Sequence, residues 1–173
     1  MSIAAEPVHV RSARPEDVPD IVAMIRELAE YERAWDEVQA SEELLHAALF
    51  GDDAATYCHI AERHGEVIGF AVWFLNFSTW LGRTGIYLED LYVRPEARGC
   101  GAGRALLRRL AAICVDRGYA RLDWAVLDWN EPARKFYESL GAEGLTDWVP
   151  YRLTGQALRN LGEAAESSTP ASR

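Results

Sequence analysis

The sequence predicts a mixed α/β fold (α+β in some schemes), in which a mixed central sheet carries helices on both faces. Strand-like and helix-like apolar patterns follow one another along the 173 residues in the order strand, two helices, three strands, helix, strand, helix, strand. The run of three strands contains a hairpin, whereas the strand–helix–strand segment after it needs a crossover connection. Residues 67–76 are apolar on both faces, so this strand is expected in the centre of the sheet.

The first half of the chain begins with a strand and two helices. Pro15-Glu16-Asp17 is a favourable first helical turn, and the apolar period that follows it ends near Tyr31. Ser41 is a good N-cap for a second, shorter helix. His64-Gly65-Glu66 separates two apolar runs and predicts a hairpin. The expected elements are a strand over 8–13, helices over 15–31 and 41–50, and strands over 57–63 and 67–76.

The second half alternates strands and helices after a loop over 77–85. Pro95 stops a strand, Gly118 ends a strongly amphipathic helix, and Asn130-Glu131-Pro132 opens a short one. The expected elements are strands over 86–94, 121–127 and 148–153, helices over 102–117 and 130–140, and a last short helix. Because no repeat or linker interrupts this order, we expect one domain over residues 1–163 and a disordered tail over 164–173.

Composition excludes several classes of function. The net charge of −9 disfavours a nucleic-acid partner, since phosphate backbones need a basic face, whereas a cationic ligand is compatible with it. Three cysteines without a CxxC pair indicate a reduced, cytoplasmic protein. Four scattered histidines show no metal-ligand spacing, so no metal site is expected. The longest apolar run, residues 69–75, is too short to span a bilayer, so no membrane association is expected.

Two adjacent carboxylates, Glu89 and Asp90, stand in the middle of the strand over 86–94. Burying a charge is costly unless a partner or a function compensates it. Strand alternation places the two side chains on opposite faces unless the strand bulges. One alternative is that a buried arginine, such as Arg152, pairs with one or both of them. The other is that they bind or deprotonate a ligand.

A glycine-rich loop with Gly99, Gly101 and Gly103 joins this strand to the helix over 102–117. Backbone N–H groups at a helix N-terminus favour a pyrophosphate. The spacing is not that of a dinucleotide-binding loop, because the third glycine would fall on Arg104 or Leu106, and no Walker sequence is present. What remains is Arg98-x-x-Gly101-x-Gly103, which by itself is also compatible with a flexible turn.

Together these residues resemble the GNAT superfamily of N-acetyltransferases. Arg98-x-x-Gly101-x-Gly103 is similar to its acyl-CoA motif, and Asn130-Glu131-Pro132-Ala133-x-x-Phe136-Tyr137-x-x-x-Gly141 is similar to its later motif. A closer resemblance, to diamine (spermidine/spermine) and thialysine acetyltransferases, rests on residues 27–32, 87–90, 98–103 and 129–132. The resemblance implies a GNAT-like, mostly antiparallel sheet, acetyl-CoA as co-substrate and a homodimer.

The resemblance also implies the positions of acetyl-CoA. The backbone of Leu91, Tyr92 and Val93 would hold the acetyl carbonyl and the pantetheine arm, and N–H groups of the loop would hold the pyrophosphate. Cys100 would contribute only its backbone, and Asn130 would touch the cofactor, although Asn130 is equally suited to be a helix N-cap. The implied pyrophosphate residues are Arg98, Gly99, Cys100, Gly101, Ala102, Gly103 and Arg104.

Catalytic and substrate residues follow in the same way. An amine with a pKa of about 10.4 is protonated at neutral pH, so attack on a thioester needs a proton acceptor, for which Glu89 is the candidate. Asp90 would bind a substrate ammonium. Tyr137 matches the proton donor to the departing CoA thiolate, although a helical tyrosine is also compatible with simple packing. Trp80 and Tyr151 match positions lining the amine channel, but tyrosine replaces the tryptophan of the family at 151, and one extra residue separates Trp80 from Glu89.

The leading hypothesis is therefore an acetyl-CoA-dependent N-acetyltransferase for a small diamine, polyamine or thialysine-like amine. The alternatives are a GNAT enzyme acting on another acceptor, such as an amino acid or a protein amine, and a non-catalytic acyl-CoA-binding sensor. Glu89 and Tyr137 argue against the sensor.

Overall fold

The computed structural model describes residues 6–166. Its contacts divide the chain into two compact units, one up to Ala125 and one from Val126. Each unit is described here by itself, and the expectation of one domain over residues 1–163 stays a prediction. Between residues 6 and 166, none of the helices combines the length and the apolar character needed to cross a bilayer.

The first unit is built on a five-stranded sheet in which every strand lies beside its neighbour in sequence. Strands β1 to β4 pair antiparallel, and β5 pairs parallel to β4. This confirms the mixed, mostly antiparallel sheet. The strands are β1 (His9–Ser12), β2 (Thr56–Arg63), β3 (Glu66–Ser78), β4 (Arg83–Val93) and β5 (Leu122–Trp124).

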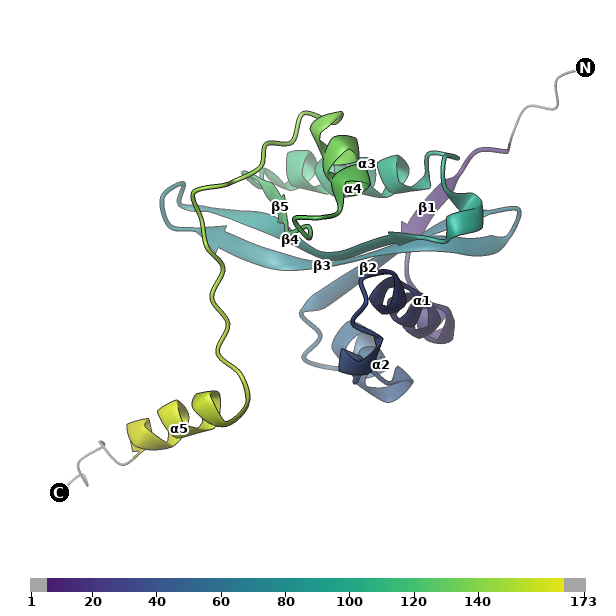
Figure 1. Cartoon of the computed structure of the whole chain (residues 1–173). Coiled ribbons are helices and arrows are strands. Elements are labelled where there is room, and N and C mark those ends of the chain that lie inside the picture. Colours follow the sequence, from purple (N-terminus) through teal and green to yellow (C-terminus); the bar gives the residue numbers. More distant parts are fainter. Residues whose placement is uncertain (1–5, 167–173) are drawn as a thin grey trace, which may run out of the picture. The chain divides into compact units, whose positions relative to one another are not determined.

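Helices cover both faces of this sheet, as Figure 1 shows for the first unit: α1 (Val18–Tyr31) and α2 (Glu42–Phe50) lie on one face and α3 (Ala102–Arg117) on the other. Three short 3₁₀ helices, η1 (Pro15–Asp17), η2 (Trp35–Glu37) and η3 (Pro95–Ala97), connect these elements. On the α1 face, buried side chains of the helix and of β2, β3 and β4 form one apolar cluster, which fixes the position of α1. Its members are Ile21, Met24, Cys58, Ile60, Phe70, Val72 and Tyr92.

The predicted local signals are present where the sequence places them. The Ser41 hydroxyl accepts a hydrogen bond from the Leu44 amide at 3.2 Å, as an N-cap should. His64 and Gly65 both have positive φ, +55° and +77°, in the two-residue turn of the β2–β3 hairpin. Gly118 ends α3 in the left-handed conformation. The strands β3 and β4 extend farther than expected, so the loop over 77–85 is a short turn between Ser78 and Arg83.

The second unit contains two helices, α4 (Glu131–Glu138) and α5 (Gly155–Glu166). The strand predicted over 148–153 is wrong here: these residues form irregular chain between the helices, and Trp148, Val149 and Tyr151 are exposed. A strand needs a neighbour for its N–H and C=O groups, and apolar alternation alone does not supply one. The strand predicted over 121–127 shortens to Leu122–Trp124 for the same reason. Because α5 reaches Glu166, the predicted tail does not begin at 164, and residues 167–173 lie outside the described residues.

Candidate active site

The acid-bearing strand β4 has a bulge at Glu89. In its register with β3, Leu88 lies opposite Trp73 and Asp90 lies opposite Val72, which leaves Glu89 without an opposite residue. The extra residue reverses the alternation of side chains along β4. Leu88 is therefore buried on the α3 side, whereas Asp90 and Tyr92 belong to the side that α1 covers. The sequence alone leaves open whether the strand bulges, and the bulge is what brings Asp90 under the end of α1.

Three carboxylates, those of Glu32, Glu89 and Asp90, form an acid cluster at the bulge of β4 and the end of α1. Asp90 is half-buried, and burial together with the charges of Glu89 and Glu32 raises its pKa to about 6. Glu32 caps the C-terminal end of α1, and burial raises its pKa as well. None of the ion pairs described between residues 6 and 163 includes one of these three groups. The alternative of a neutralising arginine therefore gains no support within the first unit, whose described residues form no ion pair with the three acids.

The charge of this cluster should cost stability, which a substitution can test. Because the pKa of Asp90 is higher in the folded protein, ionisation of this group opposes folding above pH 6 and ceases to do so as both states become protonated at lower pH. Asp90→Asn should therefore raise the free energy of unfolding at pH 7.5 by up to about 3 kcal/mol, and the gain should shrink toward pH 5. Thermal unfolding at the two pH values measures it. The exposed Asp52→Asn is the control, and an Asp90→Asn variant less stable than the parent at pH 7.5 would contradict the assignment.

The glycine loop connects β4, through η3, to the N-terminus of α3. Gly99 and Gly101 have φ of +81° and +91°, a conformation that side-chain-bearing residues rarely adopt. A Cβ at either position would meet no atom within 4 Å, so the absence of side chains leaves open space along the loop. This open backbone is the shape that an approaching pyrophosphate needs.

The hydrogen bonds of the loop amides show where the helix begins. The Arg98 amide donates to the Pro95 carbonyl at 3.2 Å, so this member of the predicted set is already engaged. The first amide to bond within α3 is that of Ala105, which donates to the Gly101 carbonyl at 2.9 Å. Residues 102–104 thus form the first turn of α3, the end at which a helix presents its N–H groups to a ligand. Cys100, within the loop, is half-buried and has no disulfide partner.

The edge of β4 that follows the bulge is the second feature that suits the predicted cofactor. β5 pairs with β4 only from Ile86 to Leu88, so β4 continues beyond it from Glu89 to Val93 without a β5 partner. An extended ligand can add to such an edge through main-chain hydrogen bonds. Leu91 and Val93 are half-buried along it, whereas the Tyr92 ring is buried in the core against Phe70. Of Tyr92, only the backbone suits the predicted cofactor role.

In the second unit, the structure places Asn130 and Tyr137 on α4. The Asn130 side chain accepts a hydrogen bond from the Ala133 amide at 3.3 Å, which confirms its N-cap role. Tyr137 is half-buried on this helix, and its ring centroid lies 5.4 Å from that of Phe136. Their contacts with acetyl-CoA remain predictions.

The two aromatic residues expected in the amine channel are highly exposed. Trp80 is 87% exposed in the turn between β3 and β4. Arg83 begins β4 and Glu89 follows six residues later, so the acids lie roughly 20 Å along the strand from this turn. The structure therefore does not bring Trp80 next to Glu89 or Asp90. Tyr151 is 96% exposed in the irregular segment of the second unit.

A buried histidine and a cavity elsewhere in the first unit are not part of this arrangement. Trp73 donates a hydrogen bond from its indole nitrogen to Nδ1 of His59 at 3.0 Å, and burial lowers the pKa of His59 to about 4. Both residues line a cavity of about 440 Å³ that contains none of the predicted site residues. Within the described part of the chain, no three His, Cys, Asp or Glu side chains are grouped as a metal site would require.

One residue of the acid cluster, Glu32, is missing from the predicted site. Its charge helps to raise the pKa of Asp90, so the end of α1 lies within electrostatic range of that carboxylate on β4. The signal that could have found it is its place at the end of the segment over 27–32, on which the closer resemblance rests. Proximity across 58 residues of chain, however, depends on the packing of α1 on the sheet.

Taken together, a bulged acidic strand, an open strand edge and a glycine loop at a helix N-terminus are the features expected of an acyl-CoA-dependent transferase. The acetyltransferase (GNAT) family model matches residues 21–142. The chain belongs to this family and is an N-acetyltransferase, a class that uses acetyl-CoA as co-substrate.

Individual proteins of known name and structure are also similar to this chain. The chain is 42% identical over 165 residues to a bovine protein named thialysine N-epsilon-acetyltransferase, covering 89% of this chain and 96% of the bovine protein. It is 30% identical to a human spermidine/spermine N(1)-acetyltransferase-like protein, over 88% of this chain but only 23% of the human protein. Among solved structures, an integron cassette protein from the mobile metagenome of V. cholerae superimposes with a TM-score of 0.75 at 31% identity, over 90% of this chain and 98% of that one.

Proposed function

We propose that this enzyme transfers the acetyl group of acetyl-CoA to a primary amine of a small diamine, polyamine or thialysine-like substrate, by direct attack of the amine on the thioester. The observation that carries the proposal is the acid cluster formed by Glu89 and Asp90 on β4, the strand that leads into the glycine loop, with Glu32 at the end of α1. A cationic substrate would supply a positive charge to this cluster. The names of the bovine and human relatives support this class of substrate.

Asp90 is the group that holds an ammonium in this proposal. Its raised pKa of about 6 results from burial and from like charges nearby, and a bound cation would oppose both effects. A diamine brings one amine that reacts and one that stays charged. The charged amine would therefore bind most tightly where Asp90 and Glu32 meet.

Glu89 accepts the proton of the reacting amine. It is exposed at the bulge, so that it can act directly or through water and then lose the proton to solvent. Freeing an amine with a pKa near 10.4 at pH 7 costs about 4 to 5 kcal/mol, which makes a positioned acceptor useful. Asp90, paired with the second cation, is less available for this task.

The chain's own groups would hold acetyl-CoA along two surfaces. Bound acetyl-CoA supplies the activated thioester. The backbone of Leu91 and Val93 forms the open edge suited to the pantetheine arm, and the amides of residues 102–104 with the open space at Gly99 and Gly101 suit the pyrophosphate. Tyr137 would then donate a proton or a hydrogen bond to the leaving sulfur.

Release of CoA tests this function. Incubation with acetyl-CoA and thialysine should release CoA thiol at a rate that depends on both substrates. Gly101→Val should abolish release and the rise in melting temperature caused by acetyl-CoA, because a side chain would fill the open space. The matched control is Gly65→Val, which strains an equally left-handed position in the hairpin turn and should keep both.

The outcomes separate the candidate functions. Binding of acetyl-CoA without CoA release on a panel of amines would identify a sensor. Release with amino acids or peptides but not with diamines or thialysine would identify another acceptor. Unchanged acetyl-CoA binding in a folded Gly101→Val variant would remove the loop from the cofactor site.

We also propose that the enzyme is a homodimer and acts in the cytoplasm. Three cysteines without disulfides support a reducing compartment. The irregular segment of the second unit exposes a series of apolar side chains, which a second copy could cover while supplying strand partners. They are Leu145, Trp148, Val149, Tyr151 and Leu153.

Light scattering at micromolar concentration should therefore give the mass of a dimer. Val149→Asp should shift the mass toward the monomer, because it places a charge in the middle of the apolar segment. Val115→Asp, which changes an equally exposed valine on α3, should leave the dimer intact. A monomeric parent protein would contradict the proposal.

A further inference from the structure

The first residue of the glycine loop is tied to the two elements that carry the acid cluster. The Arg98 guanidinium lies 5.1 Å from the ring centroid of Tyr31 on α1 and 5.9 Å from that of Tyr92 on β4. Its Nε–H donates to the Val93 carbonyl at 3.2 Å. Arg98 thus contacts both elements through two aromatic rings and one main-chain oxygen.

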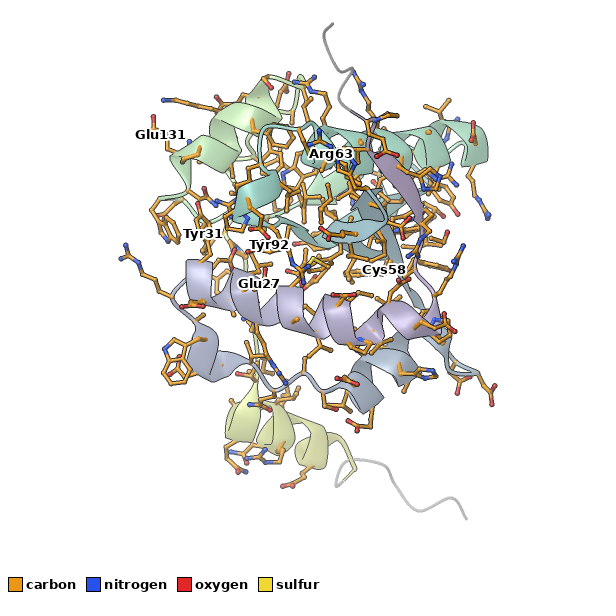
Figure 2. The ribbon with its side chains drawn as sticks, turned by 90° about the vertical axis from the view of Figure 1, so that its right-hand side faces the viewer. Glu27, Tyr31, Cys58, Arg63, Tyr92 and Glu131 are labelled. Atoms are coloured by element: carbon orange, nitrogen blue, oxygen red, sulfur yellow. The ribbon has the colours of Figure 1, made fainter. Side chains whose placement is uncertain are left out.

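These two rings adjoin the acids in sequence. Tyr31 directly precedes Glu32, and Tyr92 follows Asp90 by two residues. Glu27, one turn before Tyr31 on α1, pairs with Arg94 at 3.4 Å, and burial together with the Glu27 carboxylate raises the pKa of Tyr92. Figure 2 shows Glu27, Tyr31 and Tyr92 gathered at the same end of α1. A movement of Arg98 would therefore change its contacts with both α1 and β4, the two elements that carry the acids.

We infer that Arg98 is a positioning residue that couples the cofactor loop to the amine site. Occupation of the loop would hold Arg98 in place over Tyr31 and Tyr92, and this stack would hold the end of α1 against β4, where Glu32 and Asp90 meet. The inference rests on the proposed function and adds a coupling between the two sites, in which cofactor and amine each strengthen the binding of the other. Such coupling is reciprocal by thermodynamic necessity.

The contact is suited to coupling rather than to anchoring. Arg98 is exposed and Tyr31 is 39% exposed, so the stack can form and separate without opening the core. A cation–π contact at an exposed site is weak, which corresponds to a change of about two- to fivefold in affinity. The fixed planar guanidinium can lie over rings from two elements at once, which a lysine ammonium is less able to do.

Calorimetry on the full chain tests the inference without turnover. CoA itself occupies the loop but cannot transfer an acetyl group. Thialysine should bind the parent protein about two- to fivefold more tightly in saturating CoA than without CoA. Tyr31→Leu and Arg98→Met should each bring this ratio close to one, and the double variant should change it no further. Tyr31→Phe keeps the ring and should keep the ratio.

Each outcome decides the matter. A ratio near one in the parent, or an unchanged ratio in folded Tyr31→Leu, would overturn the inference while leaving the acetyltransferase intact. Loss of the ratio in Tyr31→Phe as well would assign the effect to the hydroxyl and also overturn it. Failure of CoA and thialysine to bind the parent at all would instead overturn the proposed function.

Discussion

Tyr137→Phe should lower kcat by roughly a hundredfold or more while leaving the affinity for acetyl-CoA nearly unchanged. The departing CoA sulfur develops negative charge, and the phenol is the group on α4 that would donate to it. A thiol pKa of about 8.5 against a phenol pKa of about 10 makes full proton transfer uphill. A hydrogen bond that strengthens as the charge develops would still stabilise the transition state.

Steady-state kinetics and acetyl-CoA titration measure the two quantities. Tyr119→Phe removes a hydroxyl from a half-buried tyrosine outside the proposed site and should leave both unchanged. If Tyr137→Phe keeps its activity within twofold of the parent, Tyr137 returns to a packing role beside Phe136. A higher KM for acetyl-CoA at unchanged kcat would instead indicate a binding role.

A diamine or thialysine-like substrate should exceed a monoamine of equal length in kcat/KM by roughly ten- to a hundredfold. A charge-assisted contact with Asp90 is worth about 1.5 to 3 kcal/mol, which gives this range. Because the pKa of Asp90 is about 6, the carboxylate is ionised at pH 7.5, and the preference should decline as the pH falls below 6. Rising salt should weaken it as well if the cluster stays open to solvent.

Substitutions of the two acids, Glu89 and Asp90, should have different effects in this experiment. Asp90→Asn should remove much of the diamine preference, since the second ammonium loses its partner. Glu89→Gln should lower the rate for every amine, and least at high pH, where free amine is abundant. Equal kcat/KM values for the matched diamine and monoamine would contradict the proposed diamine specificity but would not contradict acetyl transfer.

Much of the fold could be predicted because its signals are local. The apolar period of α3, its end at Gly118 and the cap at Ser41 depend on residues a few positions apart, and all are present in the structure. The glycine loop is equally local, since positive φ at Gly99 and Gly101 is a property of the backbone itself. The prediction of a strand over 148–153 was wrong, because a strand depends on a neighbouring strand that the alternation of side chains does not identify.

The candidate site also has features that the sequence predicts and features that only the tertiary structure shows. By itself, the sequence determined that two acids stand on a strand before a glycine loop and a helix, and its resemblance to the GNAT superfamily indicated an acyl-CoA-dependent N-acetyltransferase. Only the tertiary structure decided the bulge at Glu89, the approach of Glu32 to Asp90 and the stack of Arg98 on Tyr31 and Tyr92. The bulge depends on the pairing of β4 with β3, and the other two depend on how α1 packs on the sheet, because contacts between residues dozens of positions apart form only when buried apolar surfaces bring their elements together.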